Sequence, residues 1–119
     1  MATYRSRYLS RLYEEKFGIV GRVARIYVEA GYSVEFMHPT RYGPIHIIAR
    51  GNREKLAIEV FDKPSTVPME VANRLLEKAR LISAKPILIL YSSGAKLDEN
   101  IRRFCTENNI RIKLSLIHI

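Results

Sequence analysis

Two ionisable residues inside apolar segments are the first candidates for chemistry. Glu59 interrupts the apolar run 56–61, and His46 lies in the apolar run 45–49. A carboxylate in a buried strand is destabilising by several kcal/mol unless a nearby cation or a metal ion compensates its charge. Imidazole binds Zn²⁺ or Mn²⁺ well and Mg²⁺ poorly, so the two side chains together would supply half of a transition-metal site.

The segment between the two runs predicts that these side chains meet. Residues 50–54 read Arg-Gly-Asn-Arg-Glu, and their glycine and asparagine are typical of a hairpin turn. A turn centred on Asn52 and Arg53 makes His46 and Glu59 cross-strand neighbours, with Cβ atoms roughly 5 Å apart. Because side chains alternate along a strand, Phe61 shares their face, and so does Lys63 if the strand continues.

These two strands resemble a known motif. Ile-His-Ile-Ile-Ala (45–49), a short basic loop and Ala-Ile-Glu-Val-Phe (57–61) are similar to the core of the PD-(D/E)xK nucleases, and most of all to archaeal Holliday-junction resolvases. That family carries an Asp on the first strand and Glu-x-Lys on the second. Glu59 matches the motif, whereas His46 stands at the Asp position and Phe61 at the Lys position. The resemblance extends from about residue 20 to 91 and implies a restriction-endonuclease-like fold.

The family also places a Glu on the preceding helix. The corresponding positions 20–22 are Val, Gly and Arg in this chain. Glu14 and Glu15 precede them by several residues and would substitute only if the helix register differs.

Three interpretations of the motif remain open at the level of sequence. In the first, His46 and Glu59 are a relic pair that hydrogen-bonds internally under Phe61, and no cofactor is expected. In the second, they belong to a repurposed metal site. In the third, the chain is a working nuclease through migrated residues, with Mg²⁺ or Mn²⁺ as its cofactor and Lys63 as a further catalytic candidate. The carboxylates near enough to complete a metal site are Asp62, Glu35 and Glu70.

The charge balance points to a polyanionic partner. The chain of 119 residues has a net charge of +8 and a pI near 9.9, and nucleic acid is the commonest partner of so basic a domain. Solubility alone is the competing explanation. The residues expected to contact phosphates are Arg5, Arg7, Arg11, Arg22, Arg25, Arg41, Arg50, Arg53 and Lys55.

The N-terminal segment 1–17 is predicted to form a basic, aromatic helical arm. Tyr4, Tyr8 and Leu12 recur at helical spacing among arginines. The tyrosines would either stack on bases or pack on the body of the protein, and the sequence favours neither.

Other features narrow the class of protein. Cys105 is the one cysteine, so no intramolecular disulfide forms, and no apolar run reaches the roughly 18 residues of a membrane span. We therefore expect a cytoplasmic protein. The chain has no GxxxxGK phosphate loop, no CxxC or HExxH metal motif and no GxSxG turn.

The hydrophobic periodicity predicts one domain over residues 1–119. After the arm, a helix ends at Gly31, and strands follow at 32–37, 45–49 and 56–61. A helix from about 67 to 82, a buried strand at 87–91, a helix through 97–105 and a strand at 110–116 complete the chain. The order α-β-β-β-α-β-α-β corresponds to an α/β fold with a mixed sheet of about five strands, flanked by helices.

Three functions fit this sequence. The first is a nuclease-fold protein that has lost cleavage but binds branched or duplex DNA, as a homodimer like the resolvases it resembles. The second is an active metal-dependent DNA endonuclease or Holliday-junction resolvase with a rearranged site. The third is a non-catalytic subunit whose faces serve as a protein-assembly surface.

Overall fold

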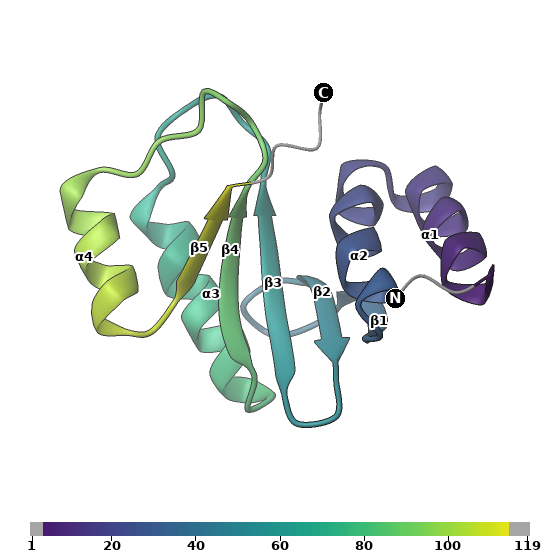
Figure 1. Ribbon diagram of the computed structural model, residues 1–119. Coiled ribbons are helices and arrows are strands. Elements are labelled where there is room, and N and C mark those ends of the chain that lie inside the picture. Colours follow the sequence, from purple (N-terminus) through teal and green to yellow (C-terminus); the bar gives the residue numbers. More distant parts are fainter. Residues whose placement is uncertain (1–3, 115–119) are drawn as a thin grey trace.

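A five-stranded sheet with helices on both faces forms the molecule (Figure 1). The computed structural model describes residues 4–114, except the side chains of Tyr4, Ser6 and Ser10. The elements in chain order are α1 (Tyr4–Phe17), α2 (Ile19–Glu29), β1 (Ser33–His38), β2 (Ile45–Arg50), β3 (Lys55–Phe61), α3 (Met69–Leu81), β4 (Lys85–Leu90), α4 (Glu99–Glu107) and β5 (Arg111–Leu114).

The sheet is mixed, as the sequence predicts. The strand order is β1-β2-β3-β4-β5, in which β1, β2 and β3 form an antiparallel meander. The β4 strand runs parallel to β3, and β5 runs parallel to β4. Helices α3 and α4 are the crossovers that parallel neighbours require.

The two faces of the sheet carry separate cores. On one face, Val23, Ala24 and Tyr27 of α2 pack on alternate residues of β2, β3 and β4. On the other face, α3 and α4 bury the remaining positions, among them Ala57 and Phe61 of β3. Both cores use the period-two alternation of the strands, so a one-residue slip would expose every buried side chain of a strand.

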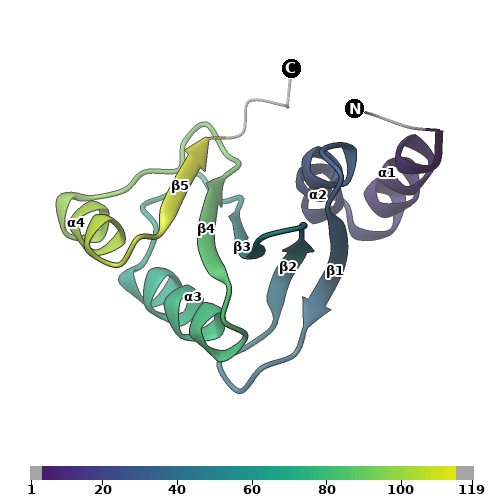
Figure 2. The ribbon, with the colours of Figure 1, turned by 60° about the horizontal axis from the view of Figure 1, so that its bottom comes forward.

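Helix α1 lies outside α2 and beyond the sheet (Figure 2). The two helices approach closely at Gly21, where an ideal Cβ would lie 2.0 Å from the backbone oxygen of Tyr13. Tyr13 and Phe17 of α1 also contact the ring of Phe36 on β1, at centroid distances of 4.8 and 4.0 Å. The predicted arm is thus a helix packed on the body of the protein.

The predicted order of elements is confirmed, and the differences are local. Helix α3 begins at Met69, after Pro68, rather than at about residue 67. The described part of the predicted last strand is β5 (Arg111–Leu114), and residues 115 and 116 lie outside the described residues. Within the part of the chain that the structure describes, no helix is long and apolar enough to span a membrane.

The close approach at Gly21 gives a test of the helix packing. Gly→Ala in a helix interior normally stabilises by about 1 kcal/mol, but at Gly21 the added methyl meets backbone that cannot rotate away. We expect Gly21→Ala to lower the free energy of unfolding by about 2 kcal/mol in urea titrations. A stabilised Gly21→Ala protein would contradict the observed approach of α1 and α2.

Candidate functional site

The hairpin between β2 and β3 has the register that the sequence predicts. Ile47 pairs with Ile58, and Arg50 pairs with Lys55 next to the turn. The same register brings His46 opposite Glu59, and His46 Nε2 lies 3.5 Å from Glu59 Oε2. Both side chains are mostly buried, with 24% and 16% of their area exposed.

The ring of His46 also completes the hydrogen bonding of β3. The backbone N–H of Val60 donates to His46 Nδ1 at 3.0 Å. A neutral imidazole that accepts at Nδ1 must carry its proton on Nε2, which is the nitrogen that faces Glu59. The hydrogen-bond network therefore assigns the Nε2–H tautomer, in which neither ring nitrogen offers a lone pair to a metal ion.

The second oxygen of Glu59 faces a lysine that the sequence analysis did not select. Lys78 Nζ of α3 lies 3.4 Å from Glu59 Oε1 and donates to the backbone oxygen of Pro44 at 2.9 Å. Only 6% of Lys78 is exposed, and no other charged residue of the described chain is as buried. The interpretation of His46 and Glu59 as a pair under Phe61 does not include this lysine. Phe61 packs in the core, and Lys78 supplies the ammonium group beside Glu59.

These groups line a cavity of about 170 Å³ between α3, β2, β3 and the loop before β2. At its mouth, Glu70 and Arg74 form an exposed ion pair on α3, with an N–O distance of 3.2 Å. The cavity is therefore lined by both acidic and basic side chains. The residues that form it are Tyr42, Gly43, Pro44, His46, Glu59, Glu70, Val71, Arg74 and Lys78.

This donor set does not fit a divalent metal ion. Mg²⁺ and Mn²⁺ sites in nucleases need several free carboxylate oxygens, whereas Glu59 faces an ammonium and an imidazole N–H, and Glu70 is paired with Arg74. Among residues 4–114, no group of three or more His, Cys, Asp or Glu side chains could hold a metal ion.

Other residues proposed for the site lie elsewhere. Lys63 and Asp62 are exposed in the loop after β3 and do not line the cavity. Glu35 of β1 binds His38 and Arg50, and these two partners hold the pKa of its carboxyl below the ordinary value. Glu14, the candidate for the helix carboxylate, pairs with Arg22 instead.

The predicted phosphate contacts divide into two groups. Arg22 and Arg25 of α2 both pair with Glu14, and Arg50 pairs with Glu35. Lys55 donates to the backbone oxygen of Ile82. These cations already have internal partners and are less available to an anion. The predicted contacts that are exposed and have no acidic partner among the described residues are Arg5, Arg7, Arg11, Arg41 and Arg53.

Comparison with known proteins supports the fold. No protein-family model matches the chain, and no curated protein matches it in sequence. AF1548, described as a protein of unknown function, has a TM-score of 0.58 at 16% identity, over 78% of this chain and 54% of that one. Pyrococcus furiosus SfsA in complex with Ca²⁺ has a TM-score of 0.57 at 11% identity, over 88% of this chain and 56% of that one.

This chain thus spans about half the length of each of these structures. At such low identities the likeness shows the fold alone. That likeness is compatible with the mixed α/β fold that the sequence predicts.

Removing one partner of the buried ion pair tests its role. We expect Lys78→Met to lower the free energy of unfolding by about 3 kcal/mol, because it leaves the Glu59 carboxylate buried without a cation. The double variant Lys78→Met/Glu59→Gln should lose less than the sum of the two single losses in urea titrations. Strictly additive losses would show that the two groups do not interact.

The tautomer of His46 gives a second test. Long-range ¹H–¹⁵N correlation spectra, taken where the imidazoles are neutral, should show the proton of His46 on Nε2. His38 is an internal control, because its Nδ1 faces the Glu35 carboxylate at 2.5 Å and should carry the proton. Addition of Mn²⁺ or Zn²⁺ should leave the His46 signals in place. A proton on Nδ1 of His46 would contradict the Val60 hydrogen bond.

Proposed function

We propose that this chain is a nucleic-acid-binding protein of nuclease-like fold that does not hydrolyse phosphodiester bonds. Its ligand is branched or duplex DNA, and it acts in the cytoplasm as a homodimer. The observation that carries the proposal is the buried pair of Lys78 and Glu59, which replaces the metal ligands of a nuclease by an internal ion pair.

The chemistry of phosphodiester cleavage explains why this pair matters. A hydrolytic nuclease uses metal ions to generate the attacking hydroxide and to stabilise the charge on the phosphate. The motif carboxylate Glu59 instead faces Lys78 and His46. SfsA is described with Ca²⁺, a cation that takes roughly six to eight oxygen ligands. The cavity of this chain offers carboxylates that are already paired, so Ca²⁺ binding is not part of the proposal.

The positive charge of the chain supports the proposed binding of DNA. The net charge is +8, and exposed arginines without described acidic partners occur on α1, in the loop before β2 and in the β2–β3 turn. Such cations neutralise phosphates and release counterions, so binding should be strongly dependent on salt.

An active endonuclease is the second candidate, and one observation favours it. Lys78 brings an ammonium group within 3.4 Å of Glu59, close to where the Lys of the motif would act. This arrangement would become catalytic only if bound DNA and metal displaced Lys78 from the carboxylate.

Gel-shift and cleavage assays on a four-way junction and a matched duplex separate these functions. With Mg²⁺, Mn²⁺ or no metal, we expect binding without cleavage, and affinity that falls at least tenfold between about 50 and 200 mM salt.

Metal-dependent cleavage that is abolished by Glu59→Gln would establish the second candidate. Absence of any DNA affinity at moderate salt would refute the proposal and favour a protein-assembly role.

A further inference from the structure

Two hollows of about 400 and 460 Å³ adjoin the turn between α2 and β1, and both include Gly31 and Tyr32 in their walls. We refer to the two hollows together as the groove. The first hollow lies between α1, α2 and β1, and the second lies between the same turn and the β2–β3 turn.

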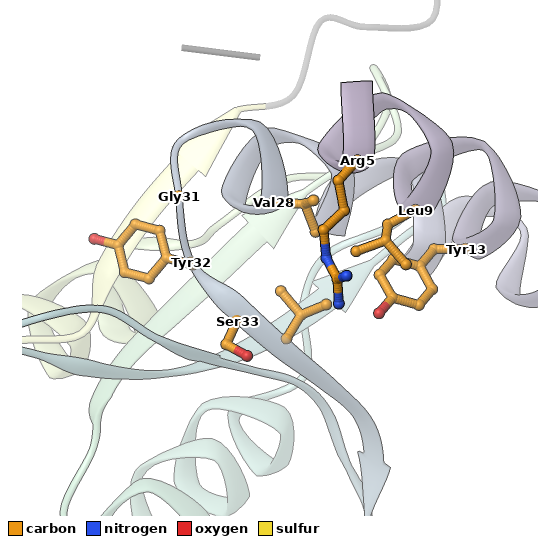
Figure 3. Close-up of a pocket in the computed structure, with 8 residues that line it drawn as sticks. Arg5, Leu9, Tyr13, Val28, Gly31, Tyr32 and Ser33 are labelled. Carbon is orange, nitrogen blue, oxygen red and sulfur yellow. The ribbon is translucent and has the colours of Figure 1, made fainter. Parts of the chain in front are cut away.

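The first hollow combines one cation with an apolar floor. Arg5, Leu9 and Tyr13 follow one face of α1 at a spacing of four residues, and Val28 and Val34 close the opposite side. Figure 3 shows the Arg5 side chain extending from α1 into this hollow, between Leu9, Tyr13 and Val28. No Asp or Glu lines it, so the guanidinium group has no acid to bind there.

The second hollow contains an acid whose charge is compensated. Glu54 accepts hydrogen bonds from the Tyr32 hydroxyl and from Lys85, and these donors hold the pKa of its carboxyl below the ordinary value. The hydrogen bond to Glu54 raises the pKa of Tyr32, so that ring remains neutral. Arg53 lines the same hollow, is exposed and has no acidic partner among the described residues.

The surroundings of the groove are basic. Arg111 begins β5 and Lys85 begins β4, at the same end of the sheet as the β2–β3 turn. The charge of Arg111 acts to lower the pKa of both the Tyr32 hydroxyl and the Glu54 carboxyl. This end of the sheet therefore presents several cations around one compensated carboxylate.

We propose that this groove binds single-stranded DNA, with phosphates on Arg5 and Arg53 and bases in the two hollows beside Tyr13 and Tyr32. The inference rests on the proposed function, because it assumes a nucleic-acid ligand, but it uses a surface remote from the Glu59 cavity.

The shape of the groove selects a single strand over a duplex. Each hollow is large enough for a nucleotide base, and a tyrosine is among the residues that line each of them. In a duplex the bases are stacked and paired, so only unpaired bases can enter such hollows and stack on aromatic side chains. One exposed arginine lines each hollow, Arg5 the first and Arg53 the second, so a strand that entered both hollows would meet a cation in each.

Fluorescence anisotropy with a labelled oligothymidylate tests the contribution of the cations. We expect Arg5→Ala/Arg53→Ala to weaken binding about tenfold or more, and to reduce the salt dependence of log K by about 1.4, since each contact to a single strand contributes about 0.7. Arg102→Ala/Arg103→Ala is the matched control, because it removes the same charge from exposed positions of α4. That control should bind almost like the unmodified protein.

The ring of Tyr32 gives a second measurement. Tyr32→Leu should weaken oligothymidylate binding about fivefold or more by removing a stacking surface. Tyr32→Phe keeps the ring and loses only the hydrogen bond to Glu54, so it should retain most of the affinity. Thermal unfolding of both variants identifies any loss that arises from misfolding.

The outcomes separate this inference from the proposed function. If the protein binds DNA and both arginine pairs weaken binding equally, or neither does, the groove is not the site, although the proposed function stands. If the protein binds duplex and junction DNA but no oligothymidylate, the inference fails alone. If it binds no DNA of any kind, both fail.

Discussion

The interaction on which the rest of the structure depends is the buried pair between Lys78 and Glu59. A carboxylate in the middle strand of a sheet, covered by a helix, would be strongly destabilising without a cation. Lys78 reaches it from α3 and also donates to Pro44, so one ammonium group connects the helix, the central strand and the loop before β2. His46 adds a further link between the strands: its Nδ1 accepts a hydrogen bond from the backbone N–H of Val60, just beyond the paired residues of β2 and β3.

The same pairing decides what the site can do. A metal ion at Glu59 would have to displace Lys78, and coordination by His46 would move its proton to Nδ1 and break the hydrogen bond from Val60. Stability and metal binding therefore compete for the same atoms. The polar groups of the cavity therefore hold α3, β3 and the loop before β2 together and are not free to bind a metal ion.

The sequence predicts the sheet well because the signals are local. Alternation locates the strands, and the turn chemistry of Gly51 and Asn52 sets the register that joins His46 to Glu59. Helical periodicity locates the apolar residues of α3 and does not by itself select Lys78. It falls seven residues after Val71 and three after Leu75, on the inner face of α3, and a lone lysine at such a position signals a buried anion. Which acid it meets depends on how α3 packs across the sheet, and no local pattern encodes that.

The basic residues show the same limit of prediction from sequence. Composition gives the net charge, whereas tertiary packing determines which cations are paired with acids. A net charge of +8 predicts an anionic partner but not its location, because most acids of the described chain are already paired with particular cations. Glu14 and Glu35 together engage Arg22, Arg25 and Arg50, which removes these from the predicted phosphate contacts. The electrostatic potential that would attract a polyanion comes from the cations that have no acidic partner. Near the α2–β1 turn the carboxylate in the lining is Glu54, which already accepts hydrogen bonds from Tyr32 and Lys85. If the ligand is a nucleic acid, as proposed, the pattern of pairing, more than the number of arginines, would favour its binding at that end of the sheet.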